Sequence, residues 1–142
     1  MSIKELKKNI LSDFHRIELV RVCGSSGYGC CLKRAFVFIS ILICNEGFMF
    51  LFWFRIGSYL KSKRNVFAKV LYIFVAFINI LNRRLTGIQV PVGTKIGQGL
   101  MFCHFGSIII ASTATIGSNC TIFQEVTIGR TWKNSPPPHY WE

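Results

Sequence analysis

The chain has 142 residues, of which 51% are hydrophobic and 14% aromatic. This composition excludes a disordered chain, because disordered segments are poor in hydrophobic residues. The formal net charge of +11 suits an anionic partner such as a membrane surface, a nucleic acid or a phosphate-bearing cofactor. Because 14 of the 17 basic residues precede Leu85, that charge belongs to the N-terminal part.

The N-terminal part, residues 1–87, is predicted to be helical. Residues 2–22 place four apolar side chains on one helical face: Leu6, Ile10, Phe14 and Ile17. A Gly/Ser-rich linker is expected at about 23–31, followed by a helical pattern from Lys33 to Lys63 that breaks at 45–47. A further apolar helix runs from Val66 to Arg84 and ends at Thr86-Gly87.

Targeting and cysteine patterns favour a cytoplasmic protein. The first residues mix charged and apolar side chains, unlike a secretory signal peptide. The apolar stretches 35–44 and 70–81 fall short of the roughly 18 residues of a membrane span and are expected to form buried or interfacial helices. The six cysteines lack zinc-site spacing, so we expect no metal, and reduced thiols that act as small buried hydrophobic residues.

A different pattern begins after Gly87, where charge nearly disappears and apolar residues recur at every sixth position. Helices repeat every three to four residues and hairpin strands every two, so neither produces this period. A six-residue period is typical of three short strands that form one coil of about 18 residues, with coils stacked on each other. The side chains expected inside are Val90, Ile96, Phe102, Ile110, Ile116, Ile122 and Ile128.

The predicted fold class is therefore α+β, with helices before a short parallel β-helix. The β-helix is expected over residues 88–131, and an irregular tail over 132–142. The period breaks once, between Phe102 and Ile110, which are eight positions apart. Loops that interrupt a regular solenoid often carry function, and this one contains His104, the only histidine of the repeats. His15, alone on the first helix, is expected to have a surface or capping role.

Three segments of the repeats resemble the serine acetyltransferase family: 95–104, 114–117 and 126–129. The sequence His-Phe-Gly at 104–106 is closer to relatives that O-acetylate capsule or other surface polysaccharides. The segments 46–48 and 54–57 are similar to the helices that precede the β-helix in that family, so the resemblance covers roughly residues 44–131.

This resemblance implies a left-handed coil, a homotrimer, and acetyl-CoA bound between neighbouring β-helices. His104 would be the catalytic general base for an acceptor hydroxyl that attacks the thioester, since imidazole titrates near working pH. A backbone N–H would stabilise the oxyanion.

Several positions depart from the family pattern. Gln89 stands fifteen residues before His104, where the family has an aspartate that orients the base, and Cys103 replaces an aspartate of the serine enzymes. We expect Gln89 and Cys103 to orient the base or bind the acceptor, and Gly129 and Arg130 to bind acetyl-CoA. Because Asp13 is the only aspartate, carboxylates for a serine ammonium look absent, which favours a sugar hydroxyl.

The sequence thus predicts an acetyl-CoA-dependent O-acetyltransferase that acts on a surface-polysaccharide sugar. One alternative is serine O-acetyltransferase in cysteine biosynthesis. Another is a truncated, non-catalytic β-helix that oligomerises or associates with a membrane, because 90–129 supply little more than two coils and solenoids generally need about three repeats. The sequence leaves two interpretations of the basic, aromatic helices open: contact with the inner membrane surface, or a solvated helical face. Nucleic-acid binding is not expected, since no recognition motif is present.

Overall fold

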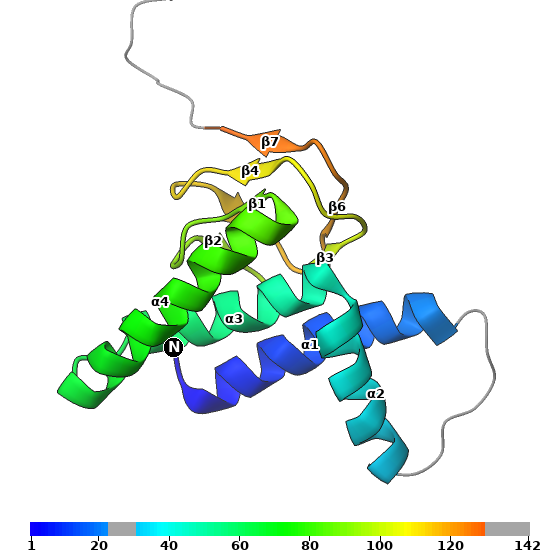
Figure 1. Ribbon diagram of the computed structural model, residues 1–142, viewed down its shortest axis with the longest axis horizontal. Coiled ribbons are helices and arrows are strands. Elements are labelled where there is room, and N and C mark those ends of the chain that lie inside the picture. Colours follow the sequence, from blue (N-terminus) through cyan, green and yellow to red (C-terminus); the bar gives the residue numbers. More distant parts are fainter. Residues whose placement is uncertain (23–30, 130–142) are drawn as a thin grey trace, which may run out of the picture.

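The computed structural model describes residues 1–22 and 31–129, and within them helices precede short strands (Figure 1). The helices are α1 (Ile3–Val22), α2 (Cys31–Cys44), α3 (Glu46–Lys61) and α4 (Val66–Thr86). The strands are β1 (Ile88–Gln89), β2 (Lys95–Ile96), β3 (Met101–Phe102), β4 (Ile108–Ile110), β5 (Thr115–Ile116), β6 (Thr121–Ile122) and β7 (Thr127–Ile128). The expected linker, except Cys31, and the expected tail lie outside the described residues.

The helix boundaries follow from local capping chemistry. Asn45 has extended backbone angles, and its Oδ1 accepts the backbone N–H of Phe48 at 2.7 Å, which begins α3. Gly87 adopts a left-handed conformation with φ 68°, and its N–H bonds to the carbonyl oxygen of Arg83 at the end of α4. The predicted break at 45–47 and the predicted helix end at 86–87 are both confirmed.

The strands form three parallel sheets, one for each face of a short β-helix (Figure 1). Their orders are β1-β4-β7, β2-β5 and β3-β6. Ile110 and Ile122 are buried, as predicted from the six-residue period, and Ile128 packs against the same core. The β-helix is therefore confirmed, while its handedness stays a prediction.

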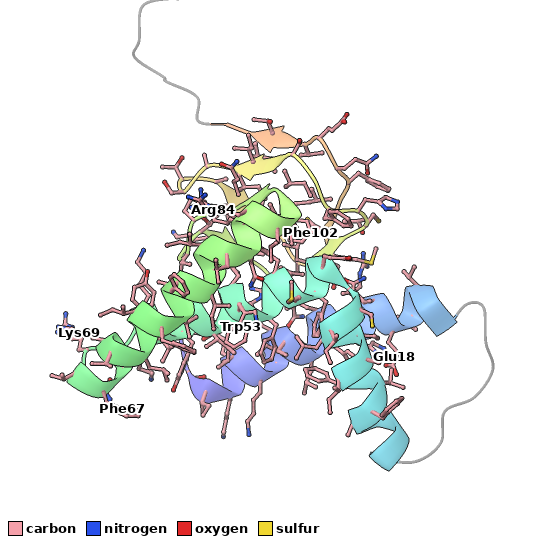
Figure 2. The ribbon with its side chains drawn as sticks, viewed as in Figure 1. Glu18, Trp53, Phe67, Lys69, Arg84 and Phe102 are labelled. Atoms are coloured by element: carbon pink, nitrogen blue, oxygen red, sulfur yellow. The ribbon has the colours of Figure 1, made fainter. Side chains whose placement is uncertain are left out.

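One hydrophobic core joins α3 to the β-helix. Phe50 and Phe54 of α3 belong to the same buried cluster as Phe102, Ile108 and Ile110 of the coils. The rings of Phe50 and Phe102 meet edge to face with their centroids 6.1 Å apart, and Figure 2 shows Phe102 directed from its strand toward the helices. Helix α3 thus covers the end of the β-helix where the first coil begins.

Helix α4 is exposed over most of its length. The stretch 70–81, expected as a buried or interfacial segment, buries only Val75 and Asn79. The buried alternative is therefore wrong for most of it, because α4 packs on α3 along one side only. In length and composition, α4 is long and apolar enough to cross a membrane.

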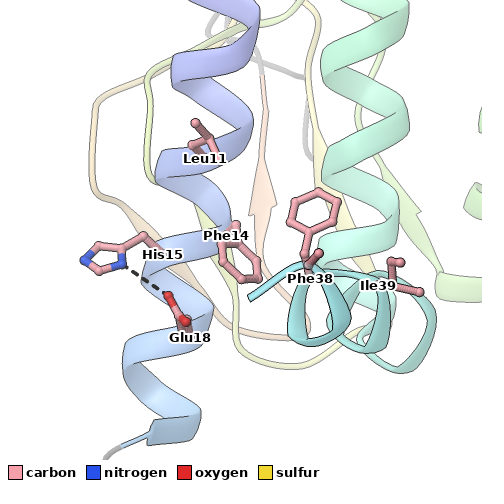
Figure 3. Close-up of a pocket in the computed structure, with 7 residues that line it drawn as sticks. Leu11, Phe14, His15, Glu18, Phe38 and Ile39 are labelled. Atoms are coloured by element: carbon pink, nitrogen blue, oxygen red, sulfur yellow. Dashed lines mark ion pairs between the residues drawn. The ribbon is translucent and has the colours of Figure 1, made fainter. Parts of the chain in front are cut away.

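A hollow of about 690 Å³ lies between α1 and α2 (Figure 3). Its lining is mostly apolar and includes Phe14, Phe38 and Ile39. His15 stands at the hollow with its Nδ1 3.5 Å from the Glu18 carboxylate, and its side chain is largely exposed. The surface role expected for His15 is therefore confirmed.

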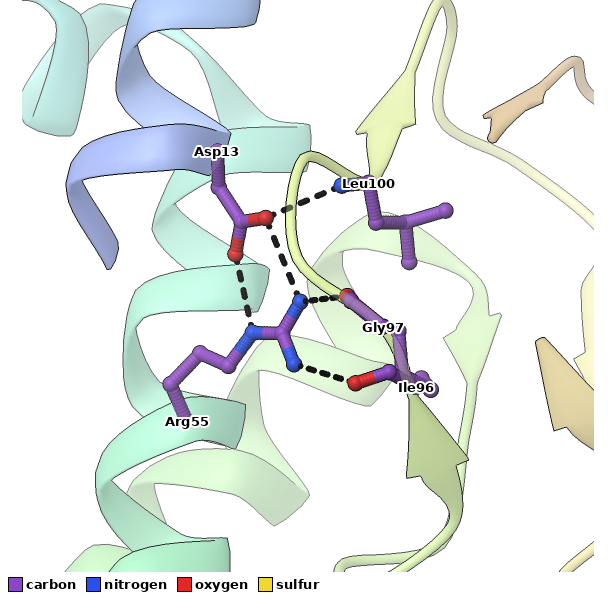
Figure 4. A network of polar contacts seen from close by, with 5 residues as sticks. All are labelled: Asp13, Arg55, Ile96, Gly97 and Leu100. Atoms are coloured by element: carbon purple, nitrogen blue, oxygen red, sulfur yellow. Dashed lines mark hydrogen bonds and ion pairs between the residues drawn. The ribbon is translucent and has the colours of Figure 1, made fainter. Parts of the chain in front are cut away.

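A buried ion pair connects α1, α3 and the first coil (Figure 4). Arg55 Nε donates to Asp13 Oδ2 at 2.9 Å, and its terminal nitrogens reach the carbonyl oxygens of Ile96 at 2.8 Å and Gly97 at 2.6 Å. The backbone N–H of Leu100 donates to Asp13 Oδ1 at 2.9 Å. Burial raises the pKa of Asp13, and the hydrogen bonds and charge of Arg55 oppose that rise.

Candidate active site

His104 lies in the turn 103–107 between β3 and β4, where the coil is longer than elsewhere. Ile88 pairs with Ile108 and Phe102 with Ile122, a step of 20 residues along the chain in each case. Ile110 pairs with Ile128, a step of 18 residues that does not include this turn. The two additional residues therefore lie in the His104 turn, as the broken period predicted.

The corner that ends α4 supports this turn. Gly106 and Ser107 both have positive φ, at 108° and 49°, a conformation that is uncommon for residues other than glycine. The carbonyl oxygen of Gly87 accepts the backbone N–H of Ile108 at 3.2 Å. A Cβ on Gly87 would lie 3.0 Å from the Ser107 nitrogen, so glycine at 87 allows the two corners to pack closely.

The side chain of His104 is exposed. Within residues 1–22 and 31–129, its ring makes no hydrogen bond to another side chain or to the backbone. Both ring nitrogens are thus free to meet a substrate, as a general base requires. A free ring is consistent with this role, because catalytic hydrogen bonds often form only in the substrate complex.

Cys103 and Gln89, predicted to orient the base or bind the acceptor, lie in different surroundings. Cys103 is half-buried and packs against the helical cluster that includes Phe14 and Phe48. Gln89 is exposed on β1 and lines a cavity of about 470 Å³ with Arg83 and Arg84. Among the described residues no hydrogen bond joins Gln89 to His104, and both assigned roles stay predictions.

The coil brings one carboxylate residue beside the His104 turn that the sequence analysis did not single out. The backbone N–H of Glu125 donates to the carbonyl oxygen of Gly106 at 3.2 Å. Glu125 is exposed, has a positive φ of 60°, and is the only acidic residue between 88 and 129. The 18-residue coil step places Glu125 level with Ser107. This step is the sequence signal that could have identified Glu125.

Of the two residues predicted to bind acetyl-CoA, only Gly129 lies within the described part of the chain. Gly129 follows β7 and is exposed, and among the described residues no atom beyond its chain neighbours lies within 4 Å of where a Cβ would be. Arg130 lies outside the described residues.

Comparisons with known proteins identify relatives of one kind. The chain is 33% identical over 101 residues to the serine acetyltransferase of Synechococcus elongatus, covering 71% of this chain and 39% of the relative. It is 41% identical over 68 residues to the serine acetyltransferase of Staphylococcus epidermidis, covering 48% of this chain and 32% of the relative. A Staphylococcus aureus serine acetyltransferase is 40% identical over 68 residues.

The chain therefore spans about a third to two fifths of the length of these relatives. No family model matches it, and no solved structure does. The named relatives are serine acetyltransferases and not polysaccharide enzymes, so the resemblance to capsule acetyltransferases stays a prediction. The sequence similarity and the six-residue coils together support a relationship to the serine acetyltransferase-like hexapeptide acetyltransferases.

Proposed function

We propose that the protein is an acetyl-CoA-dependent O-acetyltransferase in which His104 is the general base. The observation that carries this proposal is an exposed histidine on the one lengthened turn of the β-helix. The names of the relatives support acetyl transfer.

The proposed reaction is a direct transfer. A ring nitrogen of His104 takes the proton of the acceptor hydroxyl while the hydroxyl oxygen forms a bond to the thioester carbonyl carbon. The carbon–sulfur bond then breaks, and the proton passes to the leaving thiolate, which gives free CoA and the acetyl ester. A backbone N–H would stabilise the oxyanion between these steps. Gly129 and Arg130 are proposed to bind the CoA moiety.

Serine is the acceptor that we propose first. The relatives are named for serine, and their names favour it over the polysaccharide that the sequence analysis placed first. Glu125 supplies a carboxylate residue beside the turn, and a carboxylate is the group that an amino-acid ammonium requires.

A sugar hydroxyl is the second candidate. It is favoured by Gln89 and Cys103, which are uncharged where the resemblance leads us to expect aspartates. The chain's only aspartate, Asp13, is committed to the buried pair with Arg55. The homotrimer implied by the resemblance is also proposed, and sedimentation of the purified protein would test it.

The base assignment is tested by His104→Ala, with His15→Ala as a matched control on the exposed histidine of α1. We expect the rate of CoA release from acetyl-CoA to fall roughly 10²–10⁴-fold in His104→Ala and to stay at the parent level in His15→Ala. Circular dichroism would verify folding of both variants. Equal rates in His104→Ala and the parent would exclude His104 as the base. A parent that acetylates neither serine nor sugars would favour the non-catalytic alternative.

The acceptor is tested by Glu125→Gln, with Glu18→Gln as the control. If the carboxylate binds a serine ammonium, its loss should raise the KM for serine by about 10–100-fold, the effect of losing one charged hydrogen bond. The rate at saturating serine should change little. An unchanged KM for serine would remove Glu125 from acceptor binding, and turnover of sugars but not serine would reverse the order of the two acceptors.

A further inference from the structure

Helix α4 presents a continuous apolar face to solvent. Val66, Val70, Ile73 and Phe77 follow one another at steps of four, three and four residues, which is one side of a helix. With their neighbours they define the outer face of α4, whose six side chains are between 59% and 78% exposed: Val66, Phe67, Val70, Ile73, Phe74 and Phe77. Exposed apolar patches of this kind mark interaction surfaces.

The inner side of α4 is apolar in its first half and polar in its second half. Ala68 and Val75 pack with Leu60 in an apolar cluster. The buried residues that follow Val75 are Asn79, Asn82 and Thr86. Asn79 Nδ2 donates to the carbonyl oxygens of Trp53 and Val75, and Thr86 Oγ1 donates to that of Asn82. A surface helix of a soluble protein normally buries its apolar side and exposes its polar side. The second half of α4 buries polar side chains while the outer face exposes apolar ones, which indicates that the outer face meets an apolar phase.

Basic residues border this face at both ends. Lys63, Arg64 and Lys69 lie at the beginning of α4, and Arg83 and Arg84 at its end. Figure 2 shows Lys69 and Phe67 projecting from one end of the helix and Arg84 near the other. No aspartate or glutamate occurs between Glu46 and Glu125, so no carboxylate in α4, in the first coil or in α3 after its first residue offsets this positive charge.

This charge argues against a second copy of the chain as the occupant. Antiparallel pairing of two outer faces would bring Lys63 and Arg64 of one copy toward Arg83 and Arg84 of the other. Parallel pairing would set each basic cluster against itself. Like charges in such an interface repel, and the helix has no acidic group to compensate. An anionic lipid surface supplies both the apolar phase and the complementary charge.

We propose that α4 lies along an anionic phospholipid surface, with its outer face in the boundary between headgroups and acyl chains. The basic residues at both ends meet the lipid phosphates, and the β-helix stands above the membrane. The helix lies in the plane and does not cross the bilayer, because its inner side packs on α3, where Asn79 donates to the carbonyl oxygen of Trp53. This places the protein at an anionic membrane surface, and the inference does not depend on the proposed acetyl transfer.

The test is flotation of the full chain with vesicles of phosphatidylcholine alone or with phosphatidylglycerol added. We expect binding to the anionic vesicles that weakens as salt screens the charges. Phe77→Glu should lower this binding about tenfold or more, because it places a charge in the apolar boundary. Phe123→Glu is the matched control, since Phe77 and Phe123 are 59% and 55% exposed and Phe123 lies on the β-helix. The control should bind as the parent does.

A double variant tests the basic residues at the end of α4, and a second outer-face variant guards against misfolding. Replacing Arg83 and Arg84 together by glutamine should weaken binding to the anionic vesicles and leave the weak binding to phosphatidylcholine unchanged. Val70→Glu replaces Phe77→Glu if circular dichroism shows that the latter misfolds. Undiminished binding of a folded outer-face variant would overturn the proposal. An oligomer in lipid-free buffer that Phe77→Glu dissociates would also overturn it, because the outer face would then bind a second copy of the chain. The failure of the parent to bind vesicles of either composition would overturn it as well.

Discussion

Asp13 and Arg55 are 42 residues apart in the sequence, yet they form the buried contact that fixes α1 and α3 to the first coil. A single charge left in such a site is costly, because it loses hydration and gains nothing in return. The pair also binds the backbone at Ile96, Gly97 and Leu100. The contact therefore determines where the first coil lies relative to the helices.

We expect Asp13→Asn to lower the free energy of unfolding by about 3–5 kcal/mol, because it leaves the Arg55 guanidinium buried without its counter-charge. His15→Gln removes the contact between the largely exposed imidazole and Glu18 on α1 and should change stability by no more than about 1 kcal/mol. Urea unfolding of both variants provides the measurement. An Asp13→Asn variant as stable as the control would show that the carbonyl oxygens of Ile96 and Gly97 are enough to stabilise the buried Arg55.

Residues differ in how far the sequence predicts them. His104 was identified because the broken period is a local feature of the sequence, and the register places the insertion there. The roles of Asp13 and Arg55 depend on contacts between distant segments, which no local pattern indicates. Glu125 lies between these cases, since its position follows from the coil step only once the lengthened turn has been located.

At the scale of single elements, the strands are short and each is stabilised by side chains on its inner face. Strand β4 lies between β1 and β7, and on it Ile110 is 1% exposed while its neighbour Ile109 is 43% exposed. The six-residue period correctly predicted Ile110 inside, because alternate residues of a strand point to opposite faces. The burial of α4 was not predictable in this way, since hydrophobic composition does not show what covers a helix.

We expect Ile110→Ala to cost about 2–5 kcal/mol, through lost burial and the cavity that remains. Ile109→Ala on the same strand should change stability by about 0.5 kcal/mol or less, the usual range for surface substitutions. Thermal unfolding followed by circular dichroism distinguishes the two. Similar losses in both variants would mean that the outer side of β4 is covered by another surface of the protein.

For the whole molecule, the shared core determines how it unfolds. The buried cluster includes Phe50, Leu51 and Phe54 from α3 together with Ile88 and Leu100 from the first coil and Ile108 from the second. Sequence patterns predicted the helical part and the coils as separate regions, because each has its own period. They gave no indication that α3 closes the end of the β-helix, since that contact depends on three-dimensional packing. Helices and coils should therefore unfold together as one unit.

Phe50→Ala tests this coupling, because the Phe50 ring packs against Phe102 of the coil. We expect a loss of about 3–5 kcal/mol, which for a chain of this size lowers the midpoint of thermal unfolding by roughly 10–20 °C. The helical and strand signals in circular dichroism should shift together, since removing the ring weakens the contact between the two parts. Phe36→Ala on α2, where the side chain is 74% exposed, should leave the midpoint nearly unchanged. Two separate transitions, of which Phe50→Ala moves only the helical one, would show that the coils fold independently of α3.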